Sequence, residues 1–466
     1  MEFNWHEDFF NKLGNSPFNS KEEYSHFKPM FDSLFGELNC VLAELANSDN
    51  ETDNERYQSY KTILSDWHGY AKRIDSIKDT HFGYHLNLTK RSFLVDFFRT
   101  MESFEVMQNN FGDTHDITGS KSSENNYAMD VKSLEWDVVR LIAENLGLPE
   151  QPRLVELLES PEKYNDGYWG YVTSGGSESN TWSVMQGFAR FPNGIFYFSE
   201  GAHFSVPKAA LGRECCMIPL KQVDDDIIDA VQLIEKIKSN WLNFKRPAIL
   251  ILTCGTTKYG SVDDIAYVKK QLNELQVPHY LHVDAAFYGG IPRNQEGAPK
   301  IGSLDTWGYD SISVSLHKYI GYPNTKGVLI STKKPIVEVV DYIGQMDITV
   351  VCSRDIPPFS LRQQVMEIMK YTDPKEYIRC VRGFADMLTS SKIKFKQWSD
   401  DFSEGNIFVF RVDKSHSEYR SICRQWQLSE FVSKDNVHLL HVIIFPYHTK
   451  DKVELLVNDL AKITVR

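Results

Sequence analysis

The run Ala248-Ile249-Leu250-Ile251-Leu252 is apolar at every position and has the length of a β-strand. A helical pattern follows at residues 263–275, and a second apolar run follows at residues 280–283. Strands without alternating polar residues are buried on both faces, which is typical of parallel sheets that helices cover. This stretch therefore predicts an α/β fold with a mostly parallel central sheet.

The same alternation of strands and helices extends in both directions from this run. We expect further helices at 134–146, 178–190 and 227–239, and further strands at 170–173 and 194–198. After about residue 355 the pattern changes, with strands expected at 406–412 and 437–445 and a helix at 450–463. The sequence therefore predicts a large domain at 83–354, a small C-terminal α+β domain at 355–466, and a mainly helical N-terminal segment at 1–82.

The composition is that of a globular protein and disfavours several classes of partner. Of the 466 residues, 42% are hydrophobic and 24% are charged. Acidic residues outnumber basic residues by 63 to 51, so the formal net charge is -12. Neither nucleic acid nor an anionic membrane surface is therefore an expected partner. No run approaches the ~20 apolar residues that a membrane span requires.

The first residues and the cysteines favour a cytoplasmic protein. The stretch Met1-Glu2-Phe3-Asn4-Trp5-His6 lacks the basic start and apolar core of a secretory signal. The seven cysteines are scattered and form no C-x-x-C pair, which argues against a disulfide scaffold or a zinc site. We therefore expect a reducing, cytoplasmic environment.

Two charged residues close apolar strands and are candidates for chemistry. Lys318 follows Ser315-Leu316-His317, and Asp284 follows Leu281-His282-Val283. Most lysines are solvated surface residues, and many such aspartates only cap turns. A buried lysine, however, has a lowered pKa and can form a Schiff base with an aldehyde. A carboxylate at the carboxyl edge of a parallel sheet lies where such folds bind ligands, and it can keep a pyridine nitrogen protonated.

A glycine turn and a histidine follow two other strands. Gly175-Gly176-Ser177 stands between a predicted strand and a predicted helix, where backbone amides would favour an anion. The same turn is also common as an ordinary tight connection. His203 follows the strand at 194–198 and is either a buried, hydrogen-bonded residue or a ring stacked on a cofactor.

Two pairs of histidines have a spacing that could suggest a metal site. His279 is followed by His282, and His438 is followed by His441. Both pairs fall in strand-like segments, where a spacing of three residues puts the partners on opposite faces. No metal is therefore expected.

Taken in order, these motifs resemble those of the fold-type I enzymes that use pyridoxal 5'-phosphate (PLP), and more narrowly the group II amino-acid decarboxylases. Within that group the chain is most similar to the bacterial histidine decarboxylases and the plant serine decarboxylases. The resemblance covers roughly residues 83–466. It rests on Gly175-Gly176-Ser177-Glu178-Ser179-Asn180, Ala202-His203-Phe204-Ser205, Gly255-Thr256-Thr257, His282-Val283-Asp284-Ala285-Ala286 and Ser315-Leu316-His317-Lys318.

The resemblance implies a role for each of these motifs. The catalytic residues would be Lys318, which binds PLP covalently, Asp284, which pairs with the pyridine nitrogen, and His203, which stacks on the ring. The other cofactor contacts would be Gly176, Ser177, Thr257, Ala286, Ser315 and His317. The family forms homodimers with shared active sites, so the residues that contact the substrate or the neighbouring subunit would be Tyr288, Ser353 and Arg354.

The implied reaction is the PLP-dependent α-decarboxylation of an L-amino acid to an amine and CO2. The resemblance makes histidine, which gives histamine, the leading single substrate, and a carboxylate at Asp355 could favour a cationic or imidazole side chain. The bulk of Phe287 and Tyr288 could equally favour a small or acidic substrate.

Three alternatives stay open. The first is altered chemistry on the same scaffold, such as a decarboxylation-coupled oxidase or a lyase. The second is an inactive, PLP-binding homologue. The third, more distant, is a cofactor-free nucleotide-binding Rossmann protein, but the glycine turn here is not G-x-G-x-x-G.

Overall fold

The computed structural model describes residues 40–59, 61–62, 66, 80–83, 85–87, 99, 132–148, 167–221, 226–293, 308–336, 338–340, 345–347, 349–351, 354–355, 358–397 and 405–465. The chain divides into two compact units. One comprises Met1–Asp79 and Arg91–Asp96, and the other comprises Thr80–Lys90 and Phe97–Arg466. In the first unit, residues 40–46 and 51–59 are helical. The remainder of the predicted N-terminal helical segment lies largely outside the described residues.

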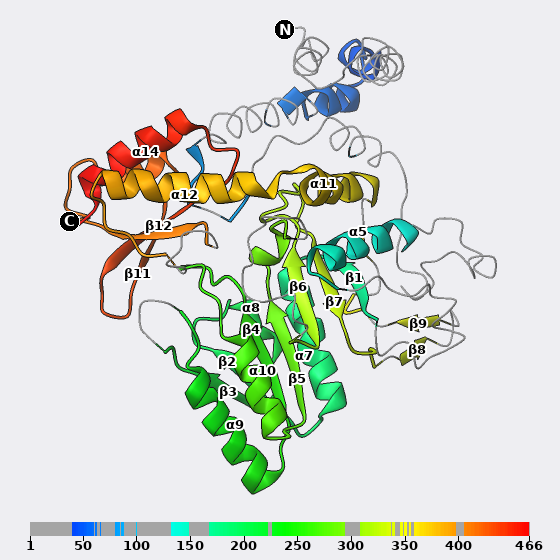
Figure 1. Ribbon diagram of the computed structural model, residues 1–466. Coiled ribbons are helices and arrows are strands. Elements are labelled where there is room, and N and C mark those ends of the chain that lie inside the picture. Colours follow the sequence, from blue (N-terminus) through cyan, green and yellow to red (C-terminus); the bar gives the residue numbers. More distant parts are fainter. Residues whose placement is uncertain are drawn as a thin grey trace. The chain divides into compact units, whose positions relative to one another are not determined.

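The second unit contains a seven-stranded sheet with the strand order β1-β7-β6-β5-β4-β2-β3 (Figure 1). Strands β2 to β6 run parallel to one another, while β7 is antiparallel to both of its neighbours. The mostly parallel sheet predicted from the sequence is thus confirmed. The strands are β1 (Trp169–Thr173), β2 (Ile195–Ser199), β3 (Cys215–Ile218), β4 (Ala248–Thr253), β5 (His279–Asp284), β6 (Ser311–Ser315) and β7 (Gly327–Ser331).

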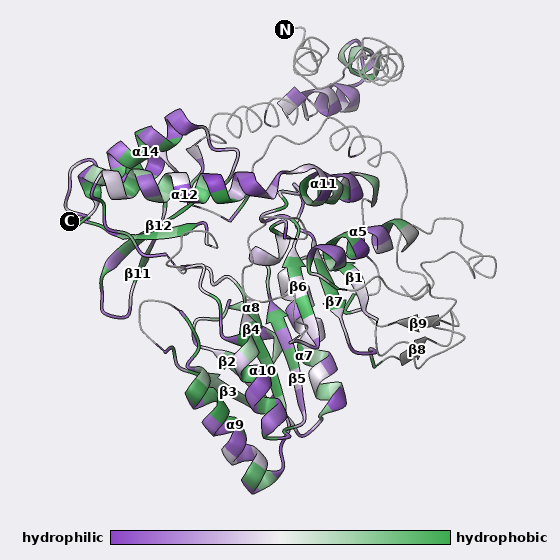
Figure 2. Cartoon of the chain, in the orientation of Figure 1, coloured by the Kyte–Doolittle hydropathy of each residue, from purple (hydrophilic) through white to green (hydrophobic). Residues whose placement is uncertain are grey.

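Helices cover both faces of this sheet, as strand β4 shows. Its alternate residues Ile249 and Ile251 pack in a cluster with Val184 and Phe188 of helix α7, whereas Leu250 lies in the main core with residues of α9 and α10. Apolar residues gather along β6 and β7, while α9 alternates polar and apolar residues (Figure 2). The helices that follow the strands are α7 (Gly176–Arg190), α8 (Ser205–Ala209), α9 (Ala230–Phe244), α10 (Ile265–Glu274) and the short η4 (Tyr288–Gly290).

Two of these helices begin slightly later than the sequence pattern indicates, because aspartates cap them. The side chain of Asp229 accepts a hydrogen bond from the Gln232 amide, and that of Asp264 accepts one from the Tyr267 amide. An N-cap residue lies just outside its helix, so the helical residues start immediately after each aspartate.

Helix α11 (Pro358–Tyr371) packs on helix α5 (Lys132–Asn145), although the two are far apart in the chain. The guanidinium of Arg362 lies 2.9 Å from the carboxylate of Asp137 across this contact. A two-stranded ribbon, β8 (Glu338–Val340) with β9 (Gln345–Asp347), precedes α11. Among the described residues, no helix has the length and apolar character needed to cross a bilayer.

The C-terminal part contains a three-stranded antiparallel sheet with the order β10-β12-β11. Figure 1 shows helices α12 and α14 on one side of it. The predicted helix at 450–463 has the bounds of α14, while the boundaries predicted at residues 82 and 354 stay predictions. The elements are α12 (Pro374–Ser390), β10 (Ile407–Arg411), α13 (Tyr419–Gln425), β11 (Ser429–Val432), β12 (His438–Ile443) and α14 (Lys450–Ile463).

Candidate active site

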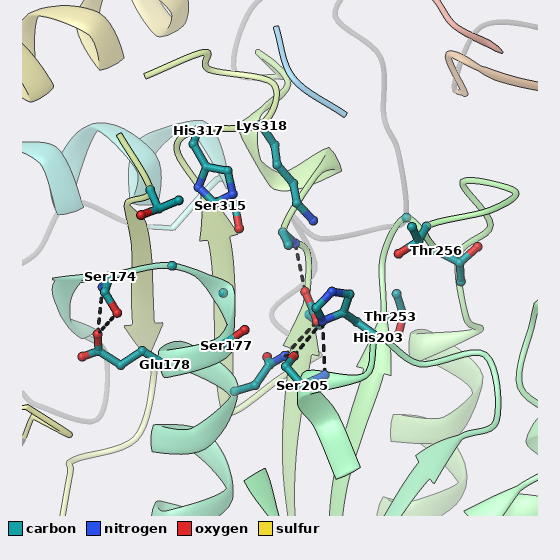
Figure 3. Close-up of a pocket in the computed structure, with 18 residues that line it drawn as sticks. Ser174, Ser177, Glu178, His203, Ser205, Thr253, Thr256, Ser315, His317 and Lys318 are labelled. Carbon is teal, nitrogen blue, oxygen red and sulfur yellow. Dashed lines mark hydrogen bonds between the residues drawn. The ribbon is translucent and has the colours of Figure 1, made fainter. Parts of the chain in front are cut away.

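A cavity of ≈ 250 Å³ lies at the carboxyl ends of the parallel strands, where open α/β sheets bind ligands. The structure brings every predicted cofactor contact to this one cavity, from five separate stretches of the chain. Figure 3 shows the Lys318 amine and the His203 ring directed into it. The predicted residues that line it are Gly176, Ser177, His203, Thr257, Asp284, Ala286, Ser315, His317 and Lys318.

One end of the cavity is suited to an anion. The N-cap of α7 is Gly175, which provides no side-chain hydrogen bond to the helix, so the first amides of the helix point toward the cavity without a side-chain cap. Gly176 leaves room for close approach, because a Cβ atom there would come 3.2 Å from the Ser315 hydroxyl and 3.6 Å from the Ala286 methyl group. Backbone amides and hydroxyl groups together form a donor set that matches a phosphate.

The carboxylate of Asp284 stands at the end of β5 and is 5% exposed. One of its oxygens accepts a hydrogen bond of 3.1 Å from the Ala286 amide, and the other accepts one of 2.9 Å from the Asn180 side chain. These donors hold the carboxylate as an acceptor at the cavity wall. Such a group can keep a pyridine nitrogen protonated.

The ring of His203 is partly buried at the cavity wall. Its Nδ1 atom lies 2.8 Å from the Ser205 hydroxyl and 3.3 Å from the Ser205 amide nitrogen, as the dashed lines of Figure 3 indicate. Burial lowers the pKa of His203 below its ordinary value, and the nearby Asp284 carboxylate partly opposes that effect. His203 is therefore neutral near pH 7.

Lys318 lies in a tight turn that follows β6. The Leu316 amide donates to the Lys326 carbonyl at 2.8 Å, and the His317 ring nitrogen Nδ1 lies 3.0 Å from the same oxygen. Burial lowers the pKa of the Lys318 amine, while the negative charge of Asp284 partly restores it. A lowered pKa increases the fraction of neutral amine, which is the form that attacks an aldehyde.

The predicted substrate contacts lie elsewhere or outside the described residues. Tyr288 is fully buried and does not line the cavity, because its ring packs on Phe287 with centroids 5.3 Å apart. The guanidinium of Arg354 is turned inward, 2.6 Å from the buried carboxylate of Glu135. Ser353 lies outside the described residues. The roles of Tyr288, Ser353 and Arg354 as contacts to the substrate or the neighbouring subunit therefore stay predictions.

Several residues to which the sequence analysis assigned no individual role also line the cavity: Ser174, Glu178, Asn180, Ser205, Thr253, Gly255, Thr256 and Thr325. Asn180 stands one helical turn after Gly176, so helical spacing from the glycine turn could have placed it on the same face. Thr325 carries no comparable signal, because it reaches the cavity from the loop between β6 and β7.

The two histidine pairs lie on strands, as expected, and their rings have other partners. His279 and His282 are on β5, and the Nδ1 atom of His282 lies 2.8 Å from the Ser311 hydroxyl. His438 and His441 are on β12, and both ring nitrogens of His441 face backbone carbonyl oxygens. No group of three potential metal ligands occurs in the part of the chain that the structure describes.

Comparison with known proteins agrees with this chemistry. Residues 152–362 match the conserved domain of the pyridoxal-dependent decarboxylases. The chain is 28% identical over 426 residues to serine decarboxylase 1 of Oryza sativa subsp. japonica, which covers 89% of this chain and 78% of that protein. It is 32% identical over 268 residues to a histidine decarboxylase of Acinetobacter baumannii, covering 56% of this chain and 62% of that protein.

Solved structures with the same fold include two amino-acid decarboxylases. L-methionine decarboxylase from Streptomyces sp.590 has a TM-score of 0.67 at 18% identity, covering 89% of this chain and 95% of that chain. Tryptophan decarboxylase from Catharanthus roseus has a TM-score of 0.64 at 14% identity, covering 96% of this chain and 98% of that chain. At these identities the likeness establishes the fold-type I architecture.

The cavity itself fits PLP. Its amides and hydroxyls suit the phosphate, the carboxylate of Asp284 suits a pyridinium, and the amine of Lys318 suits the aldehyde. Sequence match, fold and donor chemistry thus agree on one cofactor and one reaction class. Residues 152–362 thus match the conserved domain of the pyridoxal-dependent decarboxylases, and the chain is similar over most of its length to PLP-dependent amino-acid decarboxylases.

Proposed function

We propose that the protein removes the α-carboxyl group of an L-amino acid as CO2 and releases the amine, with histidine as the first candidate substrate. The observation that carries this proposal is the placement of the Lys318 amine, the Asp284 carboxylate and the His203 ring around one cavity. When bound there, PLP supplies an electron-accepting ring for the electron pair that the departing carboxylate leaves behind.

Each of the three side chains has a distinct task in the proposal. Lys318 is the nucleophile for the cofactor's aldehyde, because its lowered pKa leaves more of the amine uncharged. Asp284 provides the negative charge that holds a proton on the ring nitrogen. His203 borders the same space with a neutral imidazole, which can hold a proton and return it to carbon.

The anion end of the cavity orients the cofactor. The amides at the start of α7, with the hydroxyls of Ser177 and Ser315, would hold the phosphate as hydrogen-bond donors. The side chain of Ala286 is small enough to leave space beside the carboxylate. This arrangement anchors the cofactor at one end while Lys318 and His203 act at the other.

The choice of histidine rests on relatives. The histidine decarboxylase of Acinetobacter baumannii is 32% identical over the matched region, whereas serine decarboxylase 1 of Oryza sativa is 28% identical over more of the chain. Serine is therefore the second candidate. The three residues predicted to shape the substrate end do not distinguish histidine from serine. Asp355 is 3.6 Å from Lys326, and Phe287 and Tyr288 are buried outside the cavity.

The test is a product screen. The PLP-saturated protein is incubated with each proteinogenic L-amino acid, and CO2, amine, aldehyde and oxygen uptake are measured. The expected result is amine and CO2 in equal amounts from histidine, with no oxygen uptake. The Lys318→Ala variant is the negative control, and Lys450→Ala, on the surface of α14, is the matched lysine control.

Each alternative gives a different outcome in the same screen. If only serine gives amine and CO2, the protein is a decarboxylase of serine and not of histidine. Aldehyde with oxygen uptake would indicate a decarboxylation-coupled oxidase, and a retro-aldol product would indicate a lyase. A protein that binds PLP but converts no amino acid would be an inactive homologue, and the proposed reaction would then be wrong.

We further propose that the active unit is a homodimer. The support is the family resemblance together with the 65% exposure of Phe204, an apolar ring directly beside His203 that a second subunit could cover. Sedimentation of the PLP-bound protein should give a dimer at the concentration of the activity assay. An active monomer would contradict this proposal.

A further inference from the structure

The side chain of Asn180 joins three groups at the active site by hydrogen bonds. It is 1% exposed and lies in the second turn of α7. Its amide nitrogen Nδ2 donates to Asp284 Oδ2 at 2.9 Å and to Ser205 Oγ at 3.1 Å. Its oxygen Oδ1 lies 3.1 Å from Nε2 of His282. The side chain of Asn180 therefore contacts the Asp284 carboxylate, the Ser205 hydroxyl and the His282 ring.

The orientation of this amide follows from the chemistry of its neighbours. A carboxylate can only accept hydrogen bonds, so the side of Asn180 that faces Asp284 must be the NH2 group. Its oxygen then faces His282, whose Nε2 must carry the ring proton. Burial lowers the pKa of His282 to about 4, which keeps the ring neutral near pH 7. Its other nitrogen, Nδ1, lies 2.8 Å from the Ser311 hydroxyl, which can donate to it, whereas the Ser183 hydroxyl donates to the Ser179 carbonyl.

The second branch leads from Asn180 to His203. The Ser205 hydroxyl accepts from Asn180 and is therefore free to donate its own proton to His203 Nδ1, 2.8 Å away. The Ser205 backbone amide, which can only donate, also faces Nδ1 at 3.3 Å. Nδ1 is consequently an acceptor, and the neutral ring carries its proton on Nε2.

From these contacts we propose that Asn180 is a positioning residue for the reaction, and that it acts as the donor that holds the Asp284 carboxylate in its ionised, cofactor-facing state. The amide lies between Asp284 and His282. A rotated amide would place its NH2 group against the N–H of His282 and its oxygen against the Asp284 carboxylate, and both contacts are unfavourable. This role rests on the proposed function, because it matters only if a pyridine nitrogen binds opposite Asp284. It adds a residue that acts through Asp284 and holds no cofactor atom of its own.

The decisive variant is Asn180→Asp, which keeps the shape of the side chain and removes the NH2 donor. Near neutral and higher pH it places a second carboxylate against Asp284, and like charges at this distance repel. As the pH falls, the two carboxyl groups come to share one proton, and the shared proton restores a donor toward Asp284. A residue that only fills space would show no such recovery.

The measurement is the dissociation constant of PLP by equilibrium dialysis, as a ratio to wild type, at about pH 8 and about pH 6. We expect Asn180→Asp to weaken binding by about tenfold or more at the higher pH and by much less at the lower pH. Asn180→Leu, which keeps the volume without a charge, should weaken binding by a similar factor at both pH values. The matched control is Asn406→Asp, because Asn406 is equally buried but lies beside β10.

The inference is overturned if Asn180→Asp binds PLP as well as wild type does at the higher pH. It is also overturned if the loss of PLP affinity in Asn180→Asp equals that in Asn406→Asp and does not change with pH. If wild type itself binds no PLP, the proposed function fails. The hydrogen bond is then tested by urea unfolding of Asn180→Asp without cofactor, whose stability should fall more at the higher pH than at the lower. If Asn180→Asp does not fold, the PLP affinity of Asn180→Leu is the test. A PLP affinity equal to that of wild type in Asn180→Leu would also overturn the inference.

Discussion

The backbone amide of Asn87 donates a hydrogen bond of 2.9 Å to the carbonyl oxygen of Lys318. The side chain of Asn87 donates a second one to the Tyr319 carbonyl at 2.5 Å. Upstream, the Phe82 carbonyl accepts from the Ile443 amide at 2.7 Å, so this part of the chain is also bonded to the last residue of β12. Phe82 and Asn87 therefore bond to the C-terminal sheet and to the turn that carries the lysine, respectively.

The contact between Asn87 and Gly321 allows a matched test of this connection. Both Gly321 and Gly212 have positive φ angles, of 72° and 77°, so alanine strains the backbone similarly at either position. A Cβ atom at Gly321 would come 2.5 Å from the Asn87 carbonyl oxygen, whereas nothing lies within 4 Å at Gly212. We expect Gly321→Ala to lose more thermal stability and more PLP affinity than Gly212→Ala. Equal losses in the two variants would show that the contact does not support the lysine turn.

Replacing Asp284 should separate cofactor binding from turnover. In Asp284→Ala the phosphate contacts and Lys318 remain, so we expect PLP to be retained weakly. Without the carboxylate the ring nitrogen loses its proton, and turnover should fall far more than tenfold, which corresponds to about 1.4 kcal/mol in the barrier. The measurement is kcat at saturating PLP, with bound PLP determined in the same sample. A variant within tenfold of wild type would contradict the role of Asp284.

The buried ion pair of Arg354 with Glu135 should be more important to stability than to catalysis. The two side chains are 7% and 0% exposed, and the same Glu135 oxygen accepts from the Val172 amide at 2.8 Å. Glu135→Leu removes the carboxylate that neutralises this buried cation and should cost about 3–5 kcal/mol in the free energy of unfolding. The double variant with Arg354→Met should recover a large part of that loss. Additive losses in urea unfolding would show that the pair is not coupled.

His282 should make the protein less stable in acid. Its pKa falls from 6.5 to about 4 on folding, so between these pH values the unfolded chain binds a proton that the folded chain does not. The free energy of unfolding therefore decreases as the pH drops below 6.5, by up to about 3 kcal/mol from this residue, and is unaffected above it. We expect the free energy of unfolding of His282→Gln, measured with urea, to decrease less than that of wild type between about pH 7 and about pH 5. The exposed His438→Gln variant is the control and should keep the wild-type slope.

Sequence patterns predicted the parallel strands well because a strand buried on both faces has no polar alternation. They also indicated which residues close those strands, and the cavity lies where those ends meet. The direction of β7 was not predictable, because Gly327–Ser331 is as short and apolar as its neighbours and carries no sign of orientation. Helix α11 was missed for a related reason, since its packing on α5 depends on residues far away in the chain.

Two of the predicted site residues lie away from the cavity for a common physical reason. Tyr288 and Arg354 are polar or amphipathic side chains beside predicted strands or loops, and local sequence does not tell whether such a group finds a partner inside the protein. Arg354 pairs with Glu135, more than two hundred residues earlier in the chain. Asn180 stands in a quoted motif but received no role, because an asparagine is informative only once its partners Asp284 and Ser205 are in place.

The position of β7 in the sheet sets the order in which the site can appear during synthesis. Strand β1 lies at the sheet edge and pairs with β7 alone, and β7 separates it from β6. The anion-binding glycine turn follows β1 and Ser315 ends β6, so the nascent chain can join them only after residue 331 has left the ribosome. Until then Trp169–Thr173 is an unpaired apolar strand, a segment that a chaperone would recognise and that premature termination would expose.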